Sequence, residues 1–440
     1  MSFDRISSAH LGTLWLILMV CASVASGAES DDALDREALV IPAPLGLDWC
    51  LARARSSNPG LARAIAYADA ARYRIDSSGT LEDPRFAYEA SNIPTGDFDF
   101  GSTPLSGHQF GLRQKLPVPG LLANRRTAAR SGATSSRLLV DDEQVWVEGK
   151  VEAAWAELGF AQQARNITNR NIKLLRQLAE TAEARYRVGN GLQQDVLRSQ
   201  VELTALLQER LRRDEAISLA EADLIAILDL PIETVIPPIA DLELISELPA
   251  LGPLLSTLDE SSARLHAARS KIDEAKSQVR VAELEGYPDF DFGVGYRVRK
   301  RVAGDPVSGD DFVSAGLTLR LPINRSKWRG RVAEKRALVR RAEATLRVDR
   351  SMLESTTRRA HAELVRASAE EALMETGLVP QARQSLASSR SGYEVGRIDF
   401  LSLLDSQVRL LDAELRLARA RADKRRAFAM LESAAGEKLR

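Results

Sequence analysis

The residues that could carry out chemistry in this sequence are few and scattered. Histidine, cysteine and carboxylate side chains at short spacings would predict a metal site. The four histidines instead stand apart from one another and from both cysteines: His10, His108, His266 and His361. Gly293-Val294-Gly295 partly matches a nucleotide-binding loop, but it lies in an alternating segment where strand glycine is an ordinary structural residue. The sequence therefore predicts no catalytic centre, no resident metal and no cofactor.

The bulk composition excludes further classes of protein. Charged residues make up 28% of the 440 residues, yet the formal net charge is −1. A nucleic-acid-binding protein would have a basic excess or a basic stripe, so we expect no nucleic-acid partner. Ala, Leu, Arg and Glu dominate, which is typical of long helices rather than of a β-sandwich or a doubly wound sheet.

The N-terminus has the pattern of a secretory signal. Arg5 precedes an apolar run of about 14 residues, shorter than the ~20 that a membrane-spanning helix needs. Small residues follow, so we predict a signal peptide at 1–28 and an acidic, then proline-rich tail at 29–45. Cys21 leaves lipidation open as an alternative. If Cys21 leaves with the signal, Cys50 is the only cysteine of the mature chain and no intrachain disulfide can form.

The rest of the sequence contains an internal duplication. YRVGNGLQQDVLRSQV at 186–201 and YEVGRIDFLSLLDSQV at 393–408 share seven of sixteen residues at a constant offset of 207. GLRQKLPV at 111–118 and GLTLRLPI at 316–323 match at an offset of 205. Such repetition predicts two fused copies of one structural unit, at 46–240 and 241–440.

Each copy has the pattern of two short strands followed by two long helices. Alternating segments predict strands at about 84–92, 107–117, 288–300 and 311–321. Long segments with few helix breakers predict helices at about 120–187, 192–228, 325–394 and 398–434. The first of these helices would be ~100 Å long, and the two helices of each copy turn at a Val-Gly pair.

The last predicted helix has an apolar stripe at alternating spacings of three and four residues. This spacing predicts a left-handed coiled coil. The stripe consists of Leu401, Leu404, Val408, Leu411, Leu415, Ala418 and Ala422.

The predicted strands raise the question of closure. In the second copy Phe290, Phe292 and Val294 alternate with polar or small residues, which fits a half-buried strand or equally a membrane-barrel strand. Four strands cannot close a barrel, and an open edge lacks backbone partners in lipid. Membrane strands would therefore require oligomers: two chains give eight strands with a filled interior, and three give twelve with a lumen. In the soluble alternative, two hairpins cap a helical bundle.

Several segments resemble the outer-membrane efflux proteins, the TolC-like exit ducts. They cover nearly the whole mature chain and include NPGLARA, LRQKLPVPGLLANRRTAA, ARYRVGNGLQQDVLRSQV and LVPQARQSLASSRSGYEVGRIDFLSLLDSQVRLLDAELRLARA. The resemblance implies a mainly α fold with a small membrane β-barrel portion, assembled as a homotrimeric α/β barrel duct. This duct would lie in outer-membrane lipid and extend across the periplasm. It would passively conduct substrates for an inner-membrane pump of the resistance-nodulation-division type, joined through a periplasmic membrane-fusion adaptor.

Two further segments narrow the resemblance to one branch of the family. Pro119-Gly120 and the segment around Pro380 are similar to the branch that works with heavy-metal cation pumps. The resemblance to this branch implies metal cations as the substrate. Drug export and protein export stay open beside it, because substrate choice in such assemblies belongs mainly to the pump.

The resemblance also implies functional residues at the two helix turns. In the family these turns form the periplasmic tip where adaptor hairpins dock, and the matching residues are Val188, Gly189, Asn190, Gly191, Val395 and Gly396. Polar links made by a Tyr, an Arg and an Asp hold family tips closed. Tyr393, Arg397 and Asp195 fall at or near those places, with Arg397 one position out of step.

Rings of aspartate can line the constriction in the family. Asp405 matches one ring position, while Ser402 occupies the other and Asp399 lies nearby as a substitute. Three-fold symmetry would turn each Asp into three close carboxylates, which favour cations. The alternative is that these are ordinary solvated carboxylates on a helix surface.

Two other classes of protein stay open at this point. One is a periplasmic coiled-coil scaffold without a pore, and the other is the periplasmic adaptor itself. An adaptor needs lipoyl-like and β-barrel domains around a single hairpin, whereas this sequence predicts two hairpins and few strands.

Overall fold

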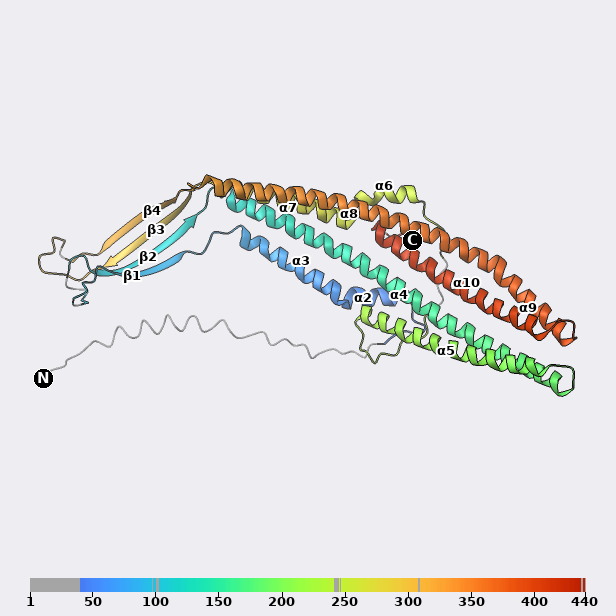
Figure 1. Cartoon of the computed structure of the whole chain (residues 1–440). Helices are drawn as coiled ribbons and strands as arrows, with labels where there is room; N and C mark the ends of the chain where they lie inside the picture. The colour runs from blue at the N-terminus through green and yellow to red at the C-terminus, as the bar shows by residue number, and fades with distance from the viewer. Residues whose placement is uncertain are drawn as a thin grey trace, which may run out of the picture. The chain divides into compact units, whose positions relative to one another are not determined.

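The computed structural model describes residues 40–440 except 97, 100–102, 241–244, 246, 308, 437 and 440. The predicted signal peptide, Cys21 and most of the predicted tail lie outside the described residues. Pro42–Arg440 form a unit distinct from Met1–Ile41. This unit consists of two tandem repeats, each with two strands and a hairpin of long helices (Figure 1).

The four strands form one antiparallel sheet in sequence order (Figure 1). They are β1 (Arg85–Ser91), β2 (Gly107–Leu116), β3 (Asp289–Val298) and β4 (Phe312–Arg320). β2 of the first repeat pairs with β3 of the second, so the repeats join at the middle of the sheet. β1 and β4 are the edges, and neither has a second strand partner within the described part of the chain.

One face of the sheet is apolar and the other is polar. The strand register places Leu112, Val294 and Ala315 side by side on the apolar face. Helices cover neither face in the described residues, and Leu317 on the apolar face is 65% exposed. The large exposed side chains of this face are Phe86, Tyr88, Phe110, Leu112, Leu116, Phe290, Phe292, Val294, Tyr296, Val298, Val313, Leu317 and Leu319. A sheet this short, with its apolar face bare, needs a surrounding that is itself apolar.

The first repeat contributes four helices, and capping residues, proline or glycine mark the start of two of them. They are α2 (Leu47–Ser57), α3 (Pro59–Ser78), α4 (Leu121–Arg187) and α5 (Gln193–Leu228). α2 and α3 are separate because the Asn58 side chain caps α3 and Pro59 occupies its first turn. α4 follows Gly120, whose φ of 89° only glycine adopts readily, and its 67 residues span ~100 Å. α5 packs back along α4 to form the first hairpin.

The second repeat differs from the first because its first long helix is interrupted. Its elements are α6 (Leu251–Ser261), α7 (Ala263–Leu284), α8 (Arg325–Leu373), the π turn η1 (Met374–Leu378), α9 (Val379–Glu394) and α10 (Phe400–Ala435). The sequence predicted one helix over 325–394, but η1 interrupts it. Pro380 lies in the first turn of α9 and lacks an N–H donor, so the wider hydrogen-bond spacing of a π turn absorbs the conflict. α4 of the first repeat has no such interruption.

The apolar residues of α10 form more than one stripe because the helix packs against α4, α8 and α9. One stripe is buried with Leu386 and Tyr393 and consists of Phe400, Leu403, Leu410 and Ala413. Leu404 and Leu411 of the predicted coiled-coil stripe pack partly buried against a second cluster around Leu175 and Leu206. Leu401 of that predicted stripe is 51% exposed. The single predicted stripe is therefore only part of the packing surface.

The buried carboxylate of Glu148 ties both ends of the described chain to the middle of α4. Arg55 Nε and Gln144 Nε2 donate hydrogen bonds to Glu148 at 2.7 and 2.9 Å, and Lys438 Nζ lies 3.1 Å from its second oxygen. Burial alone would raise the pKa of Glu148, but these three donors outweigh burial and lower the pKa to about 2.

We expect Glu148→Gln to reduce the free energy of unfolding by about 3 kcal/mol at neutral pH, from the shift between 4.5 and about 2. Because the folded-state pKa is depressed, the wild-type contribution is complete above about pH 4.5 and is lost as the pH falls toward 2. Denaturant unfolding in detergent from pH 7 to pH 3 measures this effect. Glu180→Gln, at an exposed position of the same helix, is the control. Equal stability of the two variants at pH 7 would contradict the assignment.

Candidate functional site

The two helix turns have the same backbone geometry. Gly189 and Gly396 adopt φ values of 76° and 75°. In the first turn, Gly189 N donates to Tyr186 O at 3.0 Å and Asn190 N to Arg185 O at 2.9 Å. Gly396 and Arg397 repeat these two bonds in the second turn at 3.0 and 2.8 Å. This pair of bonds is the Schellman motif, which requires a left-handed residue at the position where both turns have glycine.

The apices of both turns present apolar side chains to solvent. Val188 is 70% exposed and Val395 is 68% exposed. No backbone requirement demands valine at these positions. Two exposed valines in matching places are therefore available for contact with another protein.

Arg185, in the last turn of α4, connects the two turns. Its Nη1 donates a hydrogen bond to the carbonyl oxygen of Tyr393, and its Nε and Nη2 lie 3.4 and 3.3 Å from the carbonyl oxygen of Asn190. The guanidinium also lies over the Tyr393 ring, 4.7 Å from the centroid. Sequence reasoning missed Arg185. The signal that could have found it is a cation in the last helical turn, where it can bond the free carbonyls.

Tyr393 is buried and packed against neighbouring side chains rather than exposed at the surface. It is 4% exposed, and its ring meets Phe400 edge-on at a centroid distance of 5.5 Å. Its hydroxyl has no hydrogen-bond partner among the described residues. Burial raises the pKa of Tyr393, the charge of Asp195 raises it further, and Arg185 opposes this effect. Tyr393 therefore contacts the first hairpin through its ring and its carbonyl.

Arg397, the cation that the resemblance singles out, is exposed and forms no side-chain hydrogen bond or ion pair with any described residue. Asp195 lies in the first turn of α5, where burial raises its pKa. Arg198 and Arg185 oppose that shift, and the nearby charge of Asp399 adds to it. The fold thus brings Asp195, Arg185, Tyr393 and Asp399 together and leaves Arg397 outside this group.

The other two predicted aspartates have local partners. Asp399 caps α10, because its Oδ1 accepts a hydrogen bond from Ser402 N at 2.8 Å, and hydrogen bonds from Ser402 lower its pKa. Asp405 accepts a hydrogen bond from Arg409 Nε at 2.8 Å, and its side chain is 58% exposed. Both carboxylates keep one oxygen free of these bonds. Their placement is compatible with a lining role and also with ordinary helix chemistry.

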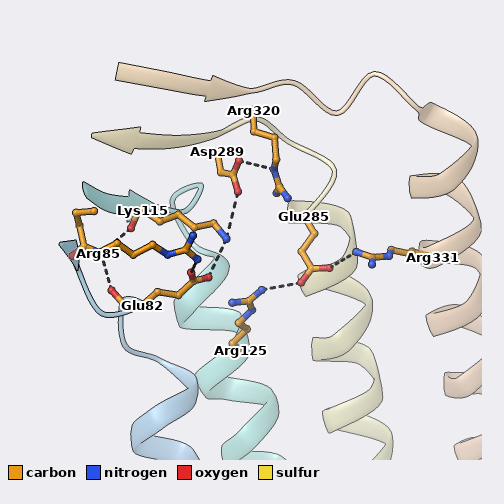
Figure 2. Close-up of polar contacts among 9 residues, drawn as sticks. Glu82, Arg85, Lys115, Arg125, Glu285, Asp289, Arg320 and Arg331 are labelled. Carbon is orange, nitrogen blue, oxygen red and sulfur yellow. Dashed lines mark hydrogen bonds and ion pairs between the residues drawn. The ribbon is translucent and has the colours of Figure 1, made fainter. Parts of the chain in front are cut away.

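A second polar cluster lies where the sheet meets the helices (Figure 2). Asp289 is buried between Lys115 and Arg320, at 3.9 and 2.7 Å. Glu285, at the end of α7, pairs with Arg125 of α4 and Arg331 of α8 at 2.9 and 3.4 Å. A cavity of about 130 Å³ lies among these residues and Trp328. The cluster links strands and helices of both repeats, so it fixes the sheet to the ends of the helices that adjoin it.

Two negative findings hold for the part of the chain that the structure describes. No group of three His, Cys, Asp or Glu side chains there lies close enough to hold a metal ion. None of the helices there contains an apolar stretch that could cross a bilayer.

The family model described as outer membrane efflux protein matches residues 50–229 and again residues 254–437. The chain belongs to the outer membrane efflux protein family. The two matches correspond to the two repeats of the fold. Members of this family are outer-membrane channels rather than enzymes, and the protein is an efflux channel of the outer membrane with a periplasmic extension.

Solved structures of outer-membrane channels have the same fold. The channel OprN matches with a TM-score of 0.76 and 18% identity, over 89% of this chain and 90% of that one. VceC from Vibrio cholerae matches with a TM-score of 0.74 and 19% identity, over 90% and 97%. A membrane protein from Pseudomonas aeruginosa matches with a TM-score of 0.77 and 18% identity, over 99% of both chains. No curated protein matches the sequence. At these identities the structural likeness establishes the fold, which is the mainly helical barrel duct that the sequence predicted.

Proposed function

We propose that this efflux channel protein works as a homotrimer that forms the exit duct of a tripartite efflux system. The observation that carries the proposal is the four-stranded sheet with a bare apolar face and two open edges. Open edges are not viable in lipid, so copies must pair β4 of one chain with β1 of the next. Three copies give twelve strands and a lumen, whereas two copies would give a filled interior. A scaffold without a pore would not explain why the apolar face of the sheet is exposed.

The polar face of the sheet then lines the lumen. Ala87, Gly111, Gly295 and Ser314 lie in register across all four strands on this face. These small side chains leave room in the middle of the barrel. The charged cluster of Figure 2 forms a collar where this lumen enters the helical part.

The helix turns form the periplasmic tips of the duct in this proposal. Val188, Gly189, Asn190 and Gly191, with Val395 and Gly396, are the surface for a membrane-fusion adaptor. The two exposed valines and the matched turn geometry support this role, because one kind of adaptor contact can then be used at both tips. The adaptor joins the duct to an inner-membrane pump of the resistance-nodulation-division type.

The closed state is held by contacts between the two hairpins near their tips. Tyr393 and Asp195 belong to this gate, and Arg185 supplies the cation for which Arg397 was the first candidate. Asp399 and Asp405 line the aperture, and three copies of each favour cations. The similarity of Pro119-Gly120 and of the Pro380 segment to the heavy-metal branch supports metal cations as the substrate class.

Single-channel recording in planar lipid bilayers tests the duct. The purified mature protein is expected to give small cation-selective openings, and Asp405→Ala is expected to reduce the cation preference. Asp412→Ala is the control, because it removes a carboxylate of the same helix that also pairs with an arginine four residues later, at 2.8 Å, but lies two turns farther from the tip. An elongated protein that stays soluble without detergent and gives no conductance would support the scaffold instead.

A further inference from the structure

The start of α8 concentrates positive charge in a way that its counterpart does not. Residues 325–341 contain eight Lys or Arg residues and one Glu, in a chain whose net charge is −1. The corresponding segment of the first repeat, 120–136 at the offset of 205, contains three. The duplication therefore does not account for this charge, and it is specific to the second repeat.

Partners within the chain do not neutralise the first two turns of α8. Arg331 pairs with Glu285, as Figure 2 shows. Arg325 and Arg329 are exposed and form no ion pair with a described residue. Lys327 lies over the Trp328 ring at 5.3 Å. The first turn contains no acidic side chain, so these cations repel one another at the positive end of the helix dipole.

The basic segment at the start of α8 lies close to the end of the apolar face of the sheet. The apolar stripe of β4 continues past the strand through Leu321 and Ile323, which are 57% and 82% exposed. Arg325 follows two residues later, and hydrogen bonds from Ile323 N to Leu321 O and from Arg325 N to Ile323 O, both 2.9 Å, make this link shorter than the ~7 Å of extended chain. The headgroup layer beyond the hydrocarbon core is ~5–8 Å thick on each side. Where the lipid-facing stripe ends, the basic segment therefore enters the headgroups of the periplasmic leaflet, and tryptophan is typical of that layer.

We propose that Arg325, Lys327 and Arg329, with Trp328 beside them, bind the headgroups of anionic phospholipids in the periplasmic leaflet. A guanidinium matches phosphate oxygens through two parallel hydrogen bonds. Trp328 lies between Lys327 and the cavity beside Glu285, so it is the tryptophan next to these cations. Each cation near an anionic surface contributes roughly fivefold to binding, so three contribute on the order of 100-fold. The inference depends on the outer-membrane position of the sheet and not on conduction through the duct.

Fluorescence quenching of the full-length mature protein in neutral detergent tests the binding. Phosphatidylglycerol brominated on its acyl chains is titrated against tryptophan fluorescence, with brominated phosphatidylcholine as the neutral probe. The triple variant Arg325→Gln/Lys327→Gln/Arg329→Gln is compared with wild type. The matched control is Lys173→Gln/Arg176→Gln/Arg187→Gln, three exposed cations of α4 nearer the tip. Wild type and control are expected to bind phosphatidylglycerol at least tenfold more tightly than phosphatidylcholine. The triple variant and 0.5 M salt are expected to remove most of this preference.

Three results would overturn the inference. The triple variant could keep the preference for phosphatidylglycerol, or it could lose trimers in neutral detergent, which would make this surface a contact between copies. Binding of peptidoglycan fragments in place of phosphatidylglycerol would assign the segment to the cell wall. Conductance in neutral bilayers is recorded alongside. Channels that persist in the triple variant separate a failure of lipid binding from a failure of the proposed duct.

Discussion

Replacing Leu317 with arginine is expected to prevent assembly in the membrane, whereas the same change at its neighbour Thr318 is expected to leave assembly intact. Leu317 lies on the apolar face beside Phe292, near the middle of β4, and is 65% exposed. Thr318 is the next residue and points to the polar face beside Asp291. Arginine on a lipid-facing strand costs about 2–4 kcal/mol at the bilayer midplane, and a trimer would bear this cost three times.

Folding into vesicles measures this difference. Both variants are refolded into phosphatidylcholine vesicles, and the heat-resistant trimer is quantified on gels together with the denaturant midpoint. Leu317→Arg should lose most of the trimer, and Thr318→Arg should fold like wild type with a changed ion selectivity. Equal folding of both variants would show that the apolar face does not contact lipid. A loss confined to Thr318→Arg would reverse the assignment of the two faces.

Removing the side chain of Arg185 is expected to open the channel. Arg185→Ala deletes the hydrogen bonds to the carbonyls of Tyr393 and Asn190 and the cation–π contact with the Tyr393 ring. Bonds made by a half-buried charged group contribute on the order of 2 kcal/mol. If these contacts exist only in the closed state, the ratio of closed to open channels falls about 30-fold.

Single-channel records compare Arg185→Ala with two controls. Arg397→Ala should leave the conductance close to that of wild type, because the Arg397 side chain forms no hydrogen bond or ion pair with a described residue. Arg185→Lys should be intermediate, since it keeps the charge but cannot reach two carbonyls at once. Large openings in Arg397→Ala and small ones in Arg185→Ala would restore Arg397 to the gate and contradict the role of Arg185.

The parts of the fold that could be predicted from the sequence depend on local patterns. Alternation of period two predicted the faces of the sheet, because neighbouring residues of a strand always point to opposite sides. The constant offset of the repeats predicted two hairpins, and the Val-Gly pairs predicted their turns, because glycine supplies the left-handed residue in each. These features need no knowledge of what packs against them.

The parts that could not be predicted depend on neighbours distant in sequence. α10 shows one stripe in the sequence but packs against α4, α8 and α9, so the prediction missed buried residues such as Phe400, Leu403 and Leu410. The π turn at Met374–Leu378 resolves a local conflict that a helix with Pro380 could also have resolved by a kink. Arg185 bonds to Tyr393, which lies 208 positions away in the sequence, so no local pattern predicts this contact. A family resemblance can only suggest residues at positions where the family itself has functional residues.

The pairing of β2 with β3 has a consequence for how copies meet. Because the two repeats share the middle of the sheet, each chain offers one edge from its first repeat and a different edge from its second. In the proposed homotrimer, neighbouring copies would therefore make heterologous, head-to-tail contacts, which close only when the rotation per subunit divides a full turn. A ring of six identical single repeats could close in the same way, but every hairpin would then have to change alike. Because the two repeats are fused, the first hairpin can keep the uninterrupted helix α4 while the second contains the π turn η1. The wall of the proposed duct would then alternate hairpins without a π turn and hairpins with one.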